Sequence, residues 1–377
     1  MQPNSTPPSR LASVDIYRGF VMFLMVAEVL QLAKLAAMFP GNWFWEQVAF
    51  HTTHVKWEGC SLHDLIQPSF SFLVGVALPF SLAARKSQGD SFGKMALHAL
   101  WRSLVLILLG VFLRSTHSTM TNWTFEDTLT QIGLGYFFLF LLGWTRPAVA
   151  WLICTFILVA YWAAWGLYPN MGTLFTDHWL KNKNFGWAFD TWFLNLFPRP
   201  QPFKENGGGY LTLSFIPTLA TMILGLIAGW WMQKDKPIKN KVIWMVAAGI
   251  VGLTSGYALD YFGICPNVKR IWTPAWVLFS GGWCFLLLAF FVAMVEGQGI
   301  RKPFFVFLVF GVNSIAIYCL SHLIDGFIKQ SLYTHLGKPF FQLLGKDYEI
   351  HFMGFCILLV LWLILYWMYR RKLFLKI

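Results

Sequence analysis

The sequence predicts an all-α protein, a polytopic transmembrane helical bundle of about ten spans with both termini in the cytoplasm. Hydrophobic residues make up 57% of its 377 positions and charged residues only 12%. The mean hydropathy is +0.55. A soluble domain carries roughly a quarter of its residues as charged side chains, so this composition excludes one. The 20 Trp and 37 Phe are typical of a chain that contacts a lipid bilayer and its interfaces.

Apolar segments of the right length recur along the chain. A hydrocarbon core of about 30 Å requires about 20 apolar residues in helical conformation. Only the turn at 144–147 separates the fourth segment from the fifth. The expected spans lie near residues 16–37, 62–84, 95–114, 128–145, 147–168, 211–233, 242–263, 274–295, 303–324 and 351–370.

Basic residues set the expected orientation. With the N-terminus in the cytoplasm, the short inner segments carry most of the Lys and Arg, as inner segments of membrane proteins do. The outer loops near 38–60, 169–210 and 325–350 carry fewer over greater length. The inner set is Arg10, Arg85, Lys86, Lys94, Arg146, Lys234, Lys236, Lys239, Lys241, Arg301, Lys302, Arg370, Arg371, Lys372 and Lys376.

This distribution also accounts for the net charge of +12 without nucleic acid, because the basic residues lie between apolar spans. The run 234–241 reflects the same bias, or it binds the phosphate groups of a ligand. We expect one transmembrane domain over 1–377, with a polar tail at 1–14, no cleavable signal peptide and a long outer loop at 169–210. The six Cys are scattered without a CxxC pair, which indicates neither disulfides nor a thiolate metal site. The oligomeric state stays open, a homodimer included.

Three ionisable residues lie in the first span. An ionised side chain at mid-membrane costs roughly 3 kcal/mol on insertion scales. Asp15 and Arg18 are three residues apart and can pair on one helix. Glu28 lies about 15 Å further along the axis, so it must face another helix or a wet cavity. A structural pair is as consistent with Asp15 and Arg18 as a catalytic one, whereas we favour a functional role for Glu28.

The densest polar run, His51-Thr-Thr-His54-Val-Lys-Trp57-Glu58-Gly59-Cys-Ser61-Leu-His63-Asp64, comes just before the second span. Ser61 and Asp64 form a capping-box pattern, so a helix is expected to begin there, with His54 and Trp57 in the preceding loop. Pro68 is expected two turns inside that helix, where it would kink it.

Three interpretations of this run are open. His51, His54 and His63 could bind zinc, although their spacing fits no standard ligand pattern. The run could be a structural cap. The third interpretation, which we favour, is a catalytic base, His54, with Asp64 as its orienting carboxylate, because imidazole accepts protons near neutral pH.

Further polar residues mark later spans. Gln131 opens the fourth, Lys269 and Trp272 precede the eighth, and Asn313 and Ser314 lie within the ninth. Interhelical hydrogen bonding explains such residues as well as substrate contact does.

Several blocks resemble one family of membrane acyltransferases. The opening Asp15-Ile-Tyr-Arg18-Gly19, the run from His54 through Trp57, Gly59 and Asp64 to Pro68, and the blocks around Gln131, Lys269-x-x-Trp272 and Asn313-Ser314 occur in this order. Together they resemble the heparan-α-glucosaminide N-acetyltransferase family and its bacterial relatives, over nearly the whole chain.

The resemblance implies a bundle of ten or eleven helices that takes acetyl-CoA from the cytosol and acetylates the amino group of a glucosamine-like sugar on the far side. No metal is expected, and the bacterial inner membrane is the expected location. His54 and Asp64 match the family's active-site histidine and aspartate. Glu28, Trp57, Gln131, Lys269, Trp272, Asn313, Ser314, Arg18 and Asp15 are the expected substrate- or cofactor-binding residues.

The sequence departs from the family in three respects. Ile132 stands where an Arg commonly follows the glutamine matched by Gln131, the link from the first span to His54 is longer, and the animal enzymes' luminal extension is absent. Two rival functions remain. One is a transporter that uses Glu28, Arg18 and Arg102. The other is an O-acyltransferase, against which Val29 counts, because that class has a histidine at this position.

Overall fold

The computed structural model describes residues 11–169 and 174–375, which contain helices and no β-strand. The one extended pairing among them is an isolated bridge between Glu58 and Val268. The α-helices are α1 (Ala12–Val26), α2 (Leu32–Ala36), α3 (Trp43–His51), α4 (Ile66–Ser87), α5 (Phe92–Ser115), α6 (Thr128–Leu142), α7 (Pro147–Gly166), α8 (Phe185–Phe193), α9 (Phe215–Gln233), α10 (Ile238–Tyr261), α11 (Pro274–Val292), α12 (Phe305–Val312), α13 (Ser314–Leu323), α14 (Asp325–Leu336), α15 (Lys338–Phe341) and α16 (Glu349–Arg370).

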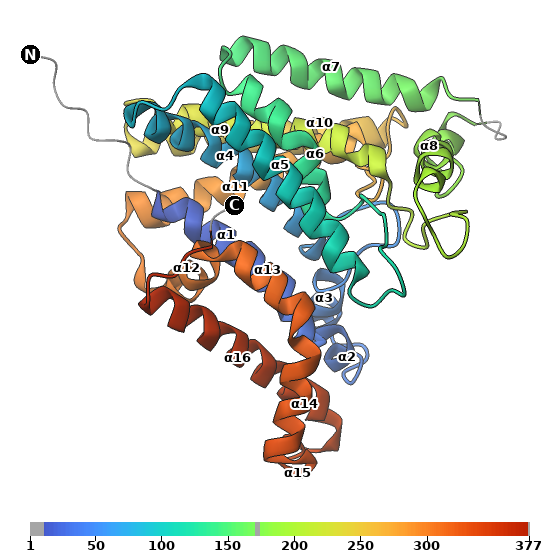
Figure 1. Ribbon diagram of the computed structural model, residues 1–377, viewed down its shortest axis with the longest axis vertical. Coiled ribbons are helices and arrows are strands. Elements are labelled where there is room, and N and C mark those ends of the chain that lie inside the picture. Colours follow the sequence, from blue (N-terminus) through green and yellow to red (C-terminus); the bar gives the residue numbers. More distant parts are fainter. Residues whose placement is uncertain (1–10, 170–173, 376–377) are drawn as a thin grey trace, which may run out of the picture.

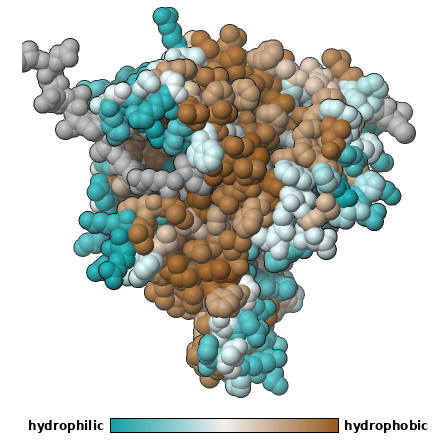
Figure 2. Space-filling model, in the orientation of Figure 1, coloured by the Kyte–Doolittle hydropathy of each residue, from teal (hydrophilic) through white to brown (hydrophobic). Residues whose placement is uncertain are grey.

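Seven helical segments of the described chain are long and apolar enough to cross a membrane, and α12 with α13 forms an eighth that is bent by 70°. The protein is therefore an integral multi-pass membrane protein. In Figure 1, α7 and α16 lie on opposite sides of the bundle, and α14 and α15 project from it. Apolar residues cover a broad part of the face in Figure 2, with polar residues gathered toward its edges.

Each of the ten predicted spans contains a helix, so the predicted all-α class is confirmed, and the seven or eight spanning segments are roughly compatible with the predicted count. The helices of the first and fourth spans are short. The first span has 15 α-helical residues in α1, followed by a 3-10 turn at Ala27–Leu30, and α6 also has 15. At 1.5 Å per residue, each of these helices covers only about 22 Å.

Helices α4 and α9 form the centre of the bundle. In their most apolar windows 67% and 83% of residues are buried, against 17% for α10 at the periphery. Glycines let the two backbones touch, because a Cβ at Gly75 of α4 would overlap the carbonyl oxygen of Met222, and one at Gly225 of α9 would overlap that of Phe72. Small residues promote this close helix packing in membranes, where no hydrophobic force drives helices together.

The predicted ninth span is not one continuous helix. Asn313 interrupts it with φ −126° and ψ 40°, between α12 and α13. Its side chain donates to the carbonyl of Leu373 at 3.0 Å and accepts from the backbone N–H of Leu375 at 3.1 Å. These two hydrogen bonds hold the segment that follows α16 against the break in the ninth span.

The predicted kink at Pro68 is wrong. The helix begins at Ile66, so Pro68 lies in its first turn, where a missing N–H costs no intrahelical hydrogen bond. The interior proline of α4 is Pro79.

Candidate active site

A loop at 52–62 joins α3 to a 3-10 turn, His63–Leu65, that leads into α4. The predicted capping box is present: Ser61 N–H donates to Asp64 Oδ2 at 3.1 Å, and Asp64 N–H donates to Ser61 Oγ at 3.3 Å. Gly59, at φ +107°, lets the loop turn, and its N–H donates to the carbonyl of Asn267 at 3.1 Å. This pairing places the loop beside the segment that precedes α11.

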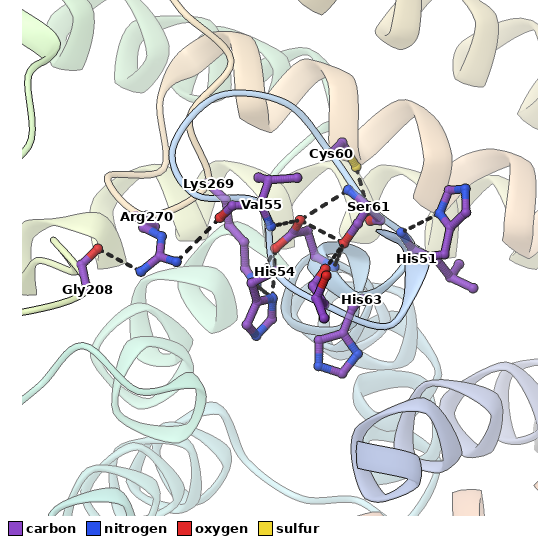
Figure 3. A network of polar contacts seen from close by, with 12 residues as sticks. His51, His54, Val55, Cys60, Ser61, His63, Gly208, Lys269 and Arg270 are labelled. Atoms are coloured by element: carbon purple, nitrogen blue, oxygen red, sulfur yellow. Dashed lines mark hydrogen bonds and ion pairs between the residues drawn. The ribbon is translucent and has the colours of Figure 1, made fainter. Parts of the chain in front are cut away.

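The pairing brings three ionisable side chains together. His54 Nδ1 lies 2.8 Å from Asp64 Oδ1, and Lys269 Nζ lies 3.2 Å from each of these two atoms. Figure 3 shows Lys269 reaching His54 from the neighbouring segment. Asp64 and Lys269 are buried, whereas the side chain of His54 is 37% exposed. The predicted pair His54 and Asp64 is thus in contact, and Lys269 joins it.

Asp64 is fixed by donors on both carboxylate oxygens. Val55 N–H donates to Oδ2 at 3.2 Å, Ser61 N–H also donates to Oδ2, and Ser61 Oγ lies 2.9 Å from it. Oδ1 is left to His54 and Lys269. A carboxylate with so many donors keeps its charge and orientation, so it can hold the imidazole in one position.

These contacts favour a neutral His54. Burial lowers the pKa of His54 below its ordinary value; hydrogen bonding to Asp64 opposes this shift, and the charge of Lys269 reinforces it. Burial also lowers the pKa of Lys269, with the Asp64 carboxylate opposing that shift. The charges of Asp64 and Lys269 offset each other, so the imidazole need carry none. If Nδ1–H donates to Asp64, the lone pair remains on Nε2.

The exposed part of His54 borders a cleft of about 910 Å³. Volumes in this range are typical of small-molecule sites. The cleft lies between the C-terminal end of α1, helices α2 and α3, and the loop. Its wall is mostly apolar, with polar residues near His54. Those polar residues are Glu28, Gln31, Lys34, Gln47, His51, Thr52, Thr53 and His63.

A second imidazole lies beside the first. The ring centroids of His54 and His63 are 4.5 Å apart, and both rings project to the same side of the loop in Figure 3. His63 Nε2 lies 2.5 Å from Glu28 Oε1. Glu28 therefore faces both the cleft and a histidine, as the sequence predicts for an acidic residue in the first span.

The structure groups a different set of possible zinc ligands from the predicted His51, His54 and His63. His51 Nδ1 accepts the N–H of Leu62 at 3.2 Å, and the ring of His51 lies apart from the other two in Figure 3. Among the described residues, the group that could hold a metal ion is Glu28, His54 and His63, with one ligand atom from each within 4.8 Å of the others.

Cys60 is the thiol in this loop. Burial raises the pKa of Cys60 to about 12, with the Asp64 charge as the next cause. A thiol of this kind is protonated at neutral pH and is a poor nucleophile. Cys60 is therefore disfavoured as the nucleophile of this site.

Trp57 faces a second, smaller cleft of about 430 Å³, which it lines with Lys56, Lys181, Gly207 and Arg270. Arg270 donates to the carbonyls of Gly208 at 2.8 Å and Val55 at 3.3 Å. It thereby links the 52–62 loop to the segment after α8. Trp57 lines this second cleft and not the one that His54 borders.

Other predicted site residues make hydrogen bonds within the bundle. Gln131 donates to the Leu211 carbonyl and accepts from Thr218 Oγ1, both at 3.0 Å. Trp272 Nε1 donates to Thr221 Oγ1 at 3.1 Å.

Residues of the first and ninth spans are also engaged. Arg18 pairs with Asp15 at 3.1 Å, as the spacing predicts. Asn313 holds the C-terminal segment, and Ser314 is the first residue of α13. Of the predicted residues, Glu28 and Lys269 are those that the fold brings to His54 and Asp64.

The site predicted from the sequence omits two candidate residues, His63 and Ser61. His63 was considered only as a zinc ligand, and its partner Glu28 is 35 residues away. Ser61 was assigned only to the helix cap, although its hydroxyl also lies against Asp64. The clustering of polar side chains in 51–64, three histidines among them, is the signal that could have included both.

The chain is similar along its length to two curated proteins. One is heparan-alpha-glucosaminide N-acetyltransferase of Homo sapiens, which is 22% identical in an alignment 442 positions long that covers 99% of this chain. The other is the Mus musculus protein of the same name, which is 22% identical in an alignment 434 positions long that covers 98% of this chain. The chain spans 61% of the length of these relatives. No protein-family model matches it. The protein is thus related, at the level of the family, to the heparan-alpha-glucosaminide N-acetyltransferases.

Proposed function

We propose that this protein is a transmembrane N-acetyltransferase that moves the acetyl group of cytosolic acetyl-CoA to the amino group of a glucosamine-type sugar across the membrane. The observation that carries the proposal is the contact of His54 with Asp64 and Lys269 at the wall of a cleft. The relation to N-acetyltransferases along 98–99% of the chain supports the reaction class. The bacterial cytoplasmic membrane is the proposed location.

The reaction needs one unprotonated nitrogen at the site. An amine attacks the thioester carbonyl, the C–N bond forms, the C–S bond breaks, and coenzyme A leaves as its thiolate. The amine must lose its proton to become an amide. His54 can accept that proton at Nε2 while Asp64 holds Nδ1–H, as general bases paired with a carboxylate do.

A second route uses the same lone pair. Nε2 attacks the thioester carbon first, the thiolate leaves, and the amine then takes the acetyl group from the imidazole. In both routes Asp64 fixes the ring, and Lys269 keeps the carboxylate charge balanced. Either route requires the neutral ring that the local charges favour.

The test is acetyl transfer by the purified full-length chain in lipid vesicles. Labelled acetyl-CoA is supplied with glucosamine, and the product is identified by mass spectrometry for the wild type, His54→Ala and Gln330→Ala. Gln330 is exposed on α14 and lines neither cleft, so its variant serves as the control. We expect N-acetylglucosamine from the wild type and the control, and none from His54→Ala.

Three outcomes would contradict the proposal. Turnover by His54→Ala at the wild-type rate would remove the imidazole from the reaction. A product that is lost in mild base would be an ester and would indicate an O-acyltransferase. Uptake of the amino sugar into vesicles without any acetylated product would indicate a transporter.

A further inference from the structure

The cleft contains two imidazoles, and the proposed reaction so far uses one. His63 is 6% exposed and lies with its ring centroid 4.5 Å from that of His54. Its Nε2 is bonded to Glu28, whose side chain is 57% exposed in the mouth of the cleft. Within the described residues, neither Nε2 of His54 nor Nδ1 of His63 has a hydrogen-bond partner. Both residues line the cleft.

Proton counting leaves a task for a second base. An alkyl amine in water at neutral pH is an ammonium ion without a lone pair. It loses one proton to become a nucleophile and a second when its adduct with the carbonyl carbon becomes an amide. The thiolate of coenzyme A takes one proton back, so one proton is released per turnover. A single imidazole can hold only one of the two at a time.

We propose that His63 is a second catalytic base, which takes the first proton from the bound ammonium, and that Glu28 is its positioning residue and proton outlet. This inference rests on the proposed acetyl transfer. His54 then takes the second proton and returns it to the departing thiolate. Two adjacent bases thus match the two protons that an ammonium acceptor must lose.

The bonds balance along this path. An N–H bond of the ammonium breaks as an N–H bond forms at Nδ1 of His63. The Nε2–H bond breaks as an O–H bond forms on Glu28, and the exposed carboxyl releases the proton to water. The negative charge of Glu28 also attracts the cationic acceptor, as opposite charges do in a partly desolvated cleft. After the product leaves, Nδ1 of His63 gives its proton to water in the cleft and Nε2 takes one back through Glu28. This restores the starting tautomer and leaves one proton released per turnover.

A purely structural role would give a different pattern. The Glu28–His63 contact could simply brace the end of α1 against the reactive loop. Removal of a brace would slow the reaction with every acceptor alike. Removal of a base for the first proton would matter only for acceptors that arrive protonated.

The experiment therefore compares two acceptors. One is glucosamine, an alkyl amine that is charged at neutral pH. The other is a glycoside with an aromatic amine, whose nitrogen is uncharged at the same pH and has one proton to lose. For each, kcat/KM is measured with the full-length protein in vesicles, as wild type, His63→Gln, Glu28→Gln and the control Gln330→Ala.

We expect His63→Gln to lower kcat/KM for glucosamine by roughly 100-fold or more, the usual contribution of a general base, with a much smaller loss for the aromatic amine. Glu28→Gln keeps an oxygen that accepts from Nε2–H but removes the charge, so it should show the same selectivity even if His63→Gln does not fold. Gln330→Ala, on the exposed surface of α14, should match the wild type with both acceptors.

Equal losses with both acceptors would make the pair a brace, and wild-type rates in both variants would leave it without a role; each result would overturn the inference while leaving the acetyl transfer intact. A wild-type protein that acetylates neither amine would overturn the proposed function itself, and this inference with it.

Discussion

Nδ1 of His54 lies 2.8 Å from Oδ1 of Asp64, at the junction of a loop and the helix that follows it. The ten residues between them include the turn at Gly59 and the capping box of Ser61. The same box that starts the helix therefore also fixes the carboxylate that holds the imidazole. Lys269 then completes the arrangement from a segment 205 residues away.

The pH dependence should report the neutral His54. Because burial lowers its pKa from 6.5, kcat/KM with an uncharged aromatic amine should stay constant down to pH 6.5 and fall only at lower pH, where Nε2 binds a proton. Lys269→Gln removes a positive charge beside the ring, so the fall should move to higher pH. The measurement is kcat/KM from about pH 4.5 to 8, a range that includes the interval of roughly pH 5–8 in which histidine usually titrates. An unchanged profile in the variant would exclude electrostatic control by Lys269.

The same lowered pKa affects folding stability in a defined direction. Between the folded-state pKa of His54 and 6.5, the unfolded chain binds more protons than the native one. The native state should therefore lose stability as pH falls through this window and be unaffected by His54 above it. Thermal unfolding in detergent should show a smaller acid-side decline in His54→Gln than in the wild type. Equal declines would contradict this assignment.

Asp64→Asn should separate catalysis from folding. It leaves the buried Lys269 ammonium without its carboxylate, and such a loss costs about 3–5 kcal/mol. The double variant Asp64→Asn/Lys269→Met removes both charges and should recover most of that stability. Neither variant should recover acetyl transfer, because the ring of His54 is no longer held. A double variant with wild-type turnover would show that Asp64 serves only the fold.

Zinc ions should inhibit the protein reversibly. Glu28, His54 and His63 offer ligand atoms within 4.8 Å of one another, and Zn–N bonds of about 2.0–2.1 Å would require only a small closure. Bound zinc would occupy the nitrogens that the transfer uses. Inhibition should disappear on addition of a chelator and weaken strongly in His63→Gln. Stimulation of the wild type by zinc would instead favour a metal-dependent reaction.

Asn313→Ala should affect stability more than activity. The two hydrogen bonds to Leu373 and Leu375 are worth about 0.5–1.5 kcal/mol each, and the residue does not line the His54 cleft. The unfolding temperature should therefore fall while KM for acetyl-CoA and acceptor stays unchanged. A raised KM with unchanged stability would return Asn313 to the binding residues that the sequence suggests.

The parts of the fold that the sequence predicts depend on neighbours along the chain. Apolar runs placed helices within all ten expected spans, because a spanning helix satisfies its own backbone hydrogen bonds. The Asp15–Arg18 pair and the Ser61–Asp64 cap join side chains three residues apart. Pro68 was misjudged because the helix starts at Ile66 rather than at the cap.

The tertiary structure determines which residues that are distant in the sequence come into contact across the bundle. No local pattern shows that His63 faces Glu28, that Lys269 reaches His54, or that Asn313 breaks its helix to hold the C-terminal segment. These contacts join residues 35 to 215 positions apart, and polar residues within apolar spans look alike until their partners are placed. The sequence alone determines a lipid-embedded bundle with an imidazole beside a carboxylate. Packing of the loop against the segment before α11 adds Lys269, and packing against the end of α1 adds Glu28, because only a folded chain can bring such distant charges into one site.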